Sequence, residues 1–236
     1  MRKQTNPIKA IFFDFDNTLA DWDSVDKKIN PFIAKYAQKE CGIDKKEFLK
    51  ILLEVCHGIK TKVPGEKYDR LIWFSYIFKV LEKKAIKKQL FLLNKIYWNF
   101  VYKNLLAFPY THEVLKRLKK KYKLVLITDS DGRTDKTKYG KLRSAKVRNY
   151  FDLIVTSNMV HANKPSKKLF LYALKKLKVS PHECMMVGDK PFTDLAPAKK
   201  LGMHTIWMAK IPKRRGQILE NQAFIDEIIT DIRSIQ

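Results

Sequence analysis

The sequence predicts an α/β fold in which a parallel sheet carries helices on both faces and a separate all-helical domain is inserted. Short apolar, strand-like runs recur along the chain, and the later ones alternate with helix-length segments. Between the first and second of these runs, residues 20–107 show helical periodicity and no convincing strand. Strands that alternate with helices of this length form parallel sheets, and so long a crossover usually folds as its own unit.

Taken in order, the elements describe a Rossmann-like core. The expected strands are 8–13, 124–128, 153–156, 184–187 and 204–208, and the expected helices between the later ones are 111–121, 138–149, 166–177 and 195–201. The polar run 130–139 is expected to be a loop. We therefore assign residues 1–19 and 108–236 to the core and 20–107 to a helical cap domain. An insertion after the first strand emerges at the carboxyl edge of the sheet, where open α/β sheets bind ligands.

Composition limits the possible functions. No apolar run approaches the roughly 20 residues that span a bilayer, and the first residues lead into a strand rather than a signal sequence, so we expect a cytoplasmic protein with no membrane partner. The three scattered cysteines lack Cys-x-x-Cys spacing, which argues against both a disulfide framework and a zinc site.

The net charge of +24, densest between residues 108 and 176, favours anionic ligands. A lysine-rich surface also follows from genome composition or from life at high temperature. No basic motif is interleaved with stacking aromatics, so we expect no specific nucleic-acid partner. For the oligomeric state we expect a monomer or homodimer.

The end of the first strand carries the clearest chemical signal. Asp14 and Asp16 follow the apolar run directly, and residues i and i+2 of an extended segment point the same way. Two carboxylates in one small volume repel each other unless a cation or a shared proton intervenes. The pair therefore predicts a metal site, an acid and base pair, or both. The alternative is turn chemistry, with Asn17 and Thr18 capping the next helix.

The second and third strands also end in useful groups. Thr128 and Asp129 follow the second strand and bring a hydroxyl and backbone N–H groups to the start of a helix, which suits an anion, although Thr128 could simply cap that helix. Lys164 follows the third strand, next to Pro165, which restricts the backbone. A lysine there can neutralise a carboxylate or a phosphoryl oxygen.

The fourth strand ends in Gly188, Asp189 and, a few residues on, Asp194. The glycine permits close backbone approach, and carboxylates from two strand ends suit Mg²⁺, which prefers hard oxygen ligands. Asp194 could instead cap the following helix. Four strand ends bearing Asp/Asp, Thr, Lys and Asp/Asp form a combination that independent turns would not be expected to produce.

These motifs resemble, in order, the four signature motifs of the haloacid dehalogenase superfamily, and the resemblance extends from about residue 10 to residue 208. The insertion point matches that of the helical cap in phosphoglycolate-phosphatase-like members. The matching positions are Asp14 to Leu19 for the first motif, Thr128 for the second, Lys164 before Pro165 for the third, and Gly188, Asp189 and Asp194 for the fourth.

The resemblance implies a magnesium-dependent phosphatase that acts on a small phosphorylated metabolite. Asp14 would be the nucleophile that forms an aspartyl-phosphate, and Asp16 the acid and base for the leaving group and for water. Mg²⁺ would be held by Asp14, Asp189 and the main-chain carbonyl of Asp16. Dehalogenases of this family lack the second aspartate of the first motif, so Asp16 favours phosphoryl transfer.

The remaining motif residues would support this centre. Thr128 and Lys164 would hold the phosphoryl oxygens, and we place Asp129 at the same anion site, although relatives often carry a small or amide residue there and its charge could alter substrate preference. Asp194 would orient Lys164 or metal-bound water, and Gly188, where the backbone can approach closely, would lie with it around the metal site. Two alternatives stay open: a phosphomutase on the same scaffold, and a basic nucleic-acid-binding protein with a degenerate hydrolase core.

Overall fold

The structure, a computed structural model, describes residues 7–56, 59, 63, 65–209 and 222–235. The chain divides into two compact units. The core unit comprises Met1–Asp21, Ala107–Asp129 and Lys146–Gln236, and the helical unit comprises Trp22–Leu106 and Ser130–Ala145.

The core unit is built on a six-stranded, all-parallel sheet in the order β3-β2-β1-β4-β5-β6. The strands are β1 (Ala10–Phe13), β2 (Lys123–Thr128), β3 (Leu153–Thr156), β4 (Cys184–Gly188), β5 (His204–Met208) and β6 (Glu227–Ile229). The predicted fold class and the five predicted strands are confirmed. The sequence analysis missed β6, a three-residue edge strand with only its last residue buried, because so short and exposed a strand has no apolar run.

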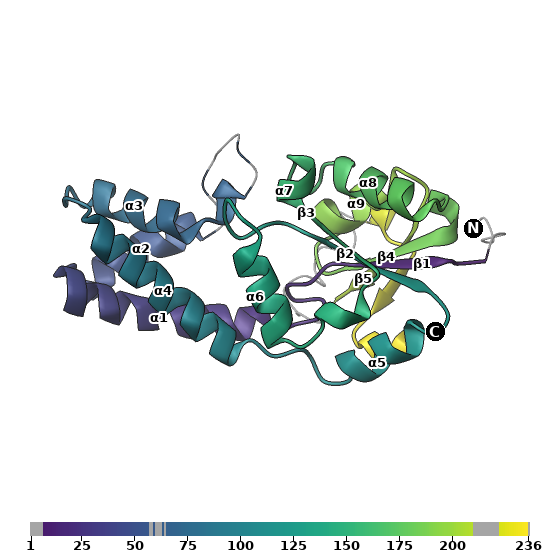
Figure 1. Cartoon of the computed structure of the whole chain (residues 1–236), viewed down its shortest axis with the longest axis horizontal. Coiled ribbons are helices and arrows are strands. Elements are labelled where there is room, and N and C mark those ends of the chain that lie inside the picture. Colours follow the sequence, from purple (N-terminus) through teal and green to yellow (C-terminus); the bar gives the residue numbers. More distant parts are fainter. Residues whose placement is uncertain (1–6, 57–58, 60–62, 64, 210–221, 236) are drawn as a thin grey trace. The chain divides into compact units, whose positions relative to one another are not determined.

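Helices cover both faces of this sheet, with α5 and α8 on opposite faces (Figure 1). The α-helices of the core unit are α5 (Thr111–Leu118), α7 (Ser157–Val160), α8 (Lys168–Leu177) and α9 (Ala196–Lys199). Helix α8 shows why the layers form. It buries Leu169, Phe170, Ala173 and Leu174, which lie on one side of a 3.6-residue period, in the same apolar cluster as sheet residues such as Phe12.

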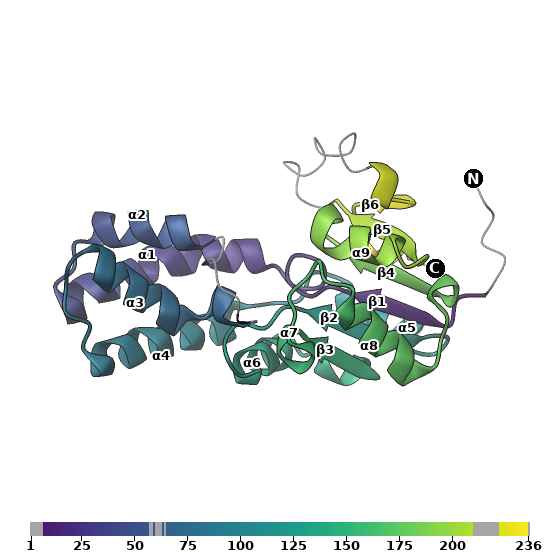
Figure 2. The same cartoon turned by 90° about the horizontal axis from the view of Figure 1, so that it is seen from above.

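Four helices of the helical unit form a bundle: α1 (Trp22–Cys41), α2 (Lys45–Val55), α3 (Arg70–Val80) and α4 (Lys87–Asn104). Helix α1 packs against α2 and α4, and α3 packs against the same two helices (Figure 2). Aromatic side chains fill the bundle, since the ring centroids of Phe48 and Tyr97 each lie 6.1 Å from that of Phe74. Burial of this apolar interior is the main source of stability for such a bundle.

Helix α6 (Lys136–Ser144) packs in the helical unit, against α4. The sequence analysis had given residues 130–145 to the core, because a helix after a strand normally covers the sheet. This helix is mainly polar, however, and lacks an apolar face for a sheet. Its Gly140 instead admits the Tyr102 ring of α4: a Cβ at this position would lie 2.6 Å from the ring carbons. The expected loop at 130–139 therefore ends earlier, at the start of α6.

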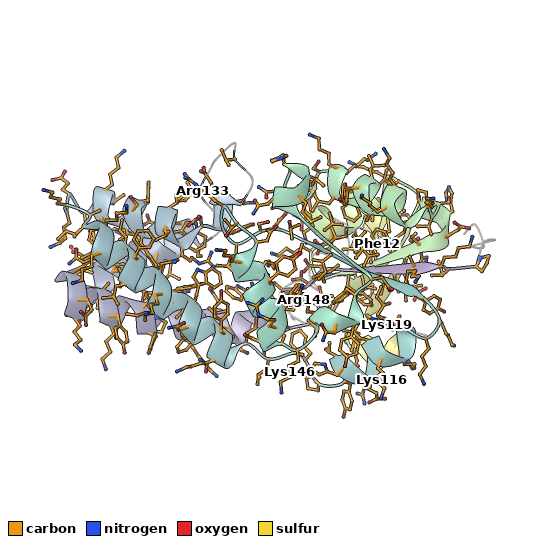
Figure 3. The ribbon with its side chains drawn as sticks, viewed as in Figure 1. Phe12, Lys116, Lys119, Arg133, Lys146 and Arg148 are labelled. Carbon is orange, nitrogen blue, oxygen red and sulfur yellow. The ribbon has the colours of Figure 1, made fainter. Side chains whose placement is uncertain are left out.

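Basic side chains gather on one part of the core unit. Lys116 lies on α5 and Lys119 just after it, while Lys146 lies just before the short turn at 148–150 and Arg148 lies on it (Figure 3). The Lys119 Nζ donates to the Asn149 carbonyl at 2.7 Å, which joins the two segments. All four side chains are exposed, so part of the net charge of +24 faces solvent here. In the described part of the chain, no helix has both the length and the apolar character needed to cross a membrane.

Candidate active site at the carboxyl ends of the strands

The chain leaves β1 through a tight loop that sets Asp14 at the edge of the sheet. The Asp14 backbone N–H donates to the Val187 carbonyl of β4 at 2.9 Å, which continues the sheet by one residue. Asn17 then takes a left-handed conformation, with φ of 65°, and its N–H donates to the Ala20 carbonyl. Asparagine tolerates this conformation better than most residues. The Asx-Thr sequence therefore does form a turn, and the turn holds two acidic residues at its start.

Lys164 lies at the centre of the site. Its Nζ is 2.5 Å from Asp14 Oδ1 and 2.8 Å from Asp194 Oδ1, and all three side chains are buried. The Asp129 carboxylate accepts a 2.9 Å hydrogen bond from the Lys164 backbone N–H, so it fixes the segment that carries the lysine. Asp129 therefore positions the lysine segment. Its predicted role in binding phosphate stays a prediction.

The end of β4 brings Asp189 and Asp194 beside this lysine. A π-helical turn (Pro191–Leu195) carries Asp194, whose Oδ2 accepts from the Lys190 N–H at 3.0 Å. Gly188 makes the approach possible, because a Cβ there would lie 2.6 Å from the Asp194 Cβ and 2.7 Å from its Oδ2. Asp194 therefore does more than cap the following helix. One of its carboxylate oxygens accepts from the Lys190 N–H and holds the turn, and the other accepts from Lys164.

Burial controls the electrostatics of this group. Removal from water raises the pKa of Asp14, and the Lys164 ammonium opposes that rise. Burial alone would lower the pKa of Lys164, but Asp14, Asp194 and Asp129 outweigh it, so the pKa of Lys164 lies well above its usual value. The lysine is therefore a permanent cation, and it offsets only part of the negative charge around it.

The donor set fits a hard divalent cation. Asp14, Asp189 and Asp194 each offer an oxygen within 4.8 Å of the others, and all three residues are buried. Three buried carboxylates beside one ammonium leave an excess of negative charge, which a bound cation would neutralise. Asp16, half-buried, is outside this trio of carboxylates.

The structure thus brings Asp14, Lys164, Asp189 and Asp194 together. Thr128 ends β2 in full burial, and its Oγ1 lies 3.4 Å from the Asp129 carbonyl.

The sequence analysis missed two supporting contacts. Trp207 of β5 donates from Nε1 to the Asp189 carbonyl at 3.0 Å, and Thr18 Oγ1 lies 3.5 Å from Asp14 Oδ2. Trp207 could have been recognised as a site residue from the sequence, because it lies near the end of the fifth predicted strand. Each of the other four predicted strand ends already supplied a site residue.

Comparison with known proteins finds one matching family model and several similar sequences and structures. The model of the haloacid dehalogenase-like hydrolase family matches residues 8–202. A glyceraldehyde 3-phosphate phosphatase of Methanothermobacter thermautotrophicus is 32% identical over 97% of this chain and 98% of its own, and one of Pyrococcus furiosus is 29% identical over 95% and 90%. The crystal structure of a HAD phosphatase from Thermococcus onnurineus superposes with a TM-score of 0.71 at 26% identity, covering 97% of this chain and 96% of that one.

Proposed function

Since the chain belongs to the haloacid dehalogenase-like hydrolases and its relatives are phosphatases, we propose that it is a magnesium-dependent phosphatase of small phosphomonoesters that works through an aspartyl-phosphate intermediate. The observation that carries the proposal is the buried group formed by Asp14, Asp189, Asp194 and Lys164 at the carboxyl edge of the sheet. These side chains suit the binding of a phosphoryl group, because the carboxylates can hold Mg²⁺ while the Lys164 ammonium faces an anionic phosphoryl oxygen.

In this proposal Asp14 attacks phosphorus, a P–O bond forms to its carboxylate, and the bond from phosphorus to the substrate oxygen breaks. Asp16 gives a proton to the departing oxygen and later takes one from the water that cleaves the aspartyl-phosphate. Lys164 and the hydroxyl of Thr128 hold the phosphoryl oxygens during both steps. A magnesium ion held by Asp14, Asp189 and the Asp16 carbonyl would reduce the repulsion between the nucleophile and the phosphate.

The relatives suggest where a substrate search should begin. Those from Methanothermobacter thermautotrophicus and Pyrococcus furiosus are named for glyceraldehyde 3-phosphate, so three-carbon phosphomonoesters are the first compounds to test on this chain. We propose that the helical unit selects the organic part of the substrate. The chain supports this role, because the loop after β1 and the residues after β2 both continue directly into that unit.

The test is Asp14→Asn, which removes the nucleophile and keeps the shape of the side chain. We expect hydrolysis of p-nitrophenyl phosphate, followed as released inorganic phosphate, to fall at least 10⁴-fold, since the isosteric amide is a very poor nucleophile. The far-ultraviolet circular dichroism of the variant should match that of the parent protein. Turnover at the parental rate would exclude Asp14 as the nucleophile, and absence of phosphate release by the parent protein with every phosphomonoester tried would exclude the phosphatase proposal.

A further inference from the structure

A cavity of about 510 Å³ opens on the helical unit at α3 and α4, two helices that pack side by side (Figure 2). Its volume lies within the range of roughly 300–1,000 Å³ that small-molecule sites occupy. All of its lining residues belong to the helical unit, and none of them is a residue of the candidate active site. We call it the α3–α4 cavity, and it is formed by one unit alone.

Apolar side chains form much of the wall of the α3–α4 cavity. Leu71, Ile72 and Tyr76 of α3 line it, together with Leu90 and Phe91 of α4. The Tyr76 and Phe91 side chains are among the large apolar ones that stay exposed, at 43% and 51%. Single exposed apolar residues are ordinary on a protein surface, whereas a group of them around one cavity is typical of a binding site. The wall therefore favours a ligand with an apolar body.

Positive charge gathers at one end of the α3–α4 cavity. Lys79 lies in the last turn of α3 and Lys87 begins α4, and both line the cavity. Both side chains are exposed, and neither pairs with a carboxylate among the residues that the structure describes. At the start of α3 the charged groups have partners instead: Arg133 pairs with Glu66 at 2.7 Å, and Asp69 accepts a backbone N–H at 2.9 Å. The two lysines are therefore the charges that remain for a ligand.

We propose that the α3–α4 cavity binds one free fatty-acid anion, with its acyl chain along the apolar wall and its carboxylate at Lys79 and Lys87. Asp69 and Lys79 both line the cavity and lie ten residues apart, about 15 Å along a helix axis, so the cavity has the length for an extended chain. The lysine ammonium groups complement the charge of a carboxylate. This inference goes beyond the proposed phosphatase activity and uses none of its residues.

A second copy of this chain suits the α3–α4 cavity less well than an anion does. Contacts between two identical subunits most often use the same surface of both, so the lysines of one copy would approach those of the other. On a chain with a net charge of +24, such a contact adds to the repulsion between the copies. A fatty-acid anion instead neutralises part of this charge.

The test is isothermal titration calorimetry of the whole protein with sodium dodecanoate and, separately, with dodecyltrimethylammonium chloride, both below their micelle concentrations. The two probes have alkyl chains of similar length and head groups of opposite charge. We expect one dodecanoate to bind per chain, about tenfold more tightly than the cation, because two lysines attract the one head group and repel the other. Decanoate and octanoate should bind progressively more weakly, by about fourfold for each methylene removed from the buried chain.

Three variants locate the bound anion. Ser75 is an exposed residue of α3 that lines the α3–α4 cavity, so Ser75→Trp places a ring in the space of the acyl chain and should lower the affinity for dodecanoate at least tenfold. Lys79→Gln combined with Lys87→Gln should lower it about tenfold without weakening the binding of dodecyltrimethylammonium. Lys95→Gln is the matched control, because Lys95 is an exposed lysine of α4 outside the lining, and it should change neither affinity.

Each result either supports or overturns the inference. Binding of one dodecanoate that Ser75→Trp and the double lysine variant both weaken supports it. Equal affinities for the two probes, or parental affinity for dodecanoate in Ser75→Trp, would overturn it. A dimer in sedimentation velocity that Ser75→Trp converts to a monomer would show that a second copy covers the cavity, and the inference would then fail. Should Ser75→Trp not fold, as judged by circular dichroism, the double lysine variant compared with Lys95→Gln decides.

Discussion

Gly188→Ala adds one methyl group at the point where the site is most tightly packed. The new Cβ would lie 2.6 Å from the Asp194 Cβ, and ordinary van der Waals contact begins at 3.4 Å, so Asp194 or the backbone must move by about 0.8 Å. The displaced side chain is the one that holds Lys164 at 2.8 Å and the Lys190 N–H at 3.0 Å. The substitution therefore acts on the lysine through the carboxylate that positions it.

Two magnitudes follow from this displacement. Overpacking of a closely packed site costs about 1–3 kcal/mol in the free energy of unfolding. A shift approaching 1 Å in a group that positions the chemistry lowers the rate by about 10²-fold. We therefore expect Gly188→Ala to lose about 10²-fold in kcat/KM for p-nitrophenyl phosphate, together with a modest loss of stability.

Two other glycines serve as matched controls. Gly140→Ala is equally crowded, with its Cβ 2.6 Å from the Tyr102 ring, and should lower stability without the same loss of phosphate release on p-nitrophenyl phosphate. Gly132→Ala meets its nearest neighbour, Asp69, at 3.4 Å and should change stability little. Urea unfolding followed by circular dichroism measures the stabilities. Parental kcat/KM and parental stability in Gly188→Ala would refute the argument that this glycine makes room for Asp194.

Three further predictions concern the proton donor, the metal and a charged pair away from the site. Asp16→Asn should lower steady-state turnover by about 10²–10⁴-fold and let the phosphorylated protein accumulate, which intact-mass spectrometry would detect. Treatment with EDTA should abolish phosphate release and added Mg²⁺ should restore it, and full activity in EDTA would exclude the metal role. Burial raises the pKa of Asp226, but hydrogen bonds from Lys199 and Thr205 outweigh it and hold this pKa below its usual value. The ionised Asp226 therefore stabilises the fold fully above its pKa in the unfolded chain, which is about 4, and this contribution is lost as the pH falls through its lower pKa in the folded protein. Asp226→Asn should therefore lower the free energy of unfolding at pH 7 by about 0.5–1 kcal/mol, with a smaller difference at pH 3 in urea unfolding; an equal difference at both pH values would contradict the linkage.

Much of the fold follows from the sequence, because a buried parallel strand has a distinctive pattern. Runs such as Leu124 to Ile127 are apolar throughout and end abruptly in polar residues, which marks both the strand and its carboxyl end. The segment 130–145 could not be placed in the same way. Its packing depends on one close contact of Gly140 with Tyr102 and on the ion pairs of Asp131, and long-range contacts of this kind leave no local periodic signal.

The candidate site was likewise predictable only in part. Because parallel strands end at one edge of the sheet, the sequence predicts that one group of side chains lies together: Asp14, Lys164, Asp189 and Asp194. The contact between the Asp129 carboxylate and the Lys164 N–H could not be predicted, because it depends on how the loop after β3 folds. The sequence analysis placed Asp129 at the anion site, which stays a prediction, and could not foresee that its carboxylate also holds the Lys164 segment.

Two of the strand ends that carry site residues continue directly into the helical unit, and two do not. The segments that follow β1 and β2 pass into the helical unit, after Asp21 and Asp129, whereas those that follow β3 and β4 stay within the core unit. Lys164, Asp189 and Asp194 lie on segments that stay within the core unit, where Trp207 also donates to the Asp189 carbonyl. Asp16 and Thr128 lie on the two strand ends that continue into the helical unit. We infer that substitutions in the helical unit act on the site through these two connections, one of which carries Asp14 and Asp16 and the other Thr128 and Asp129.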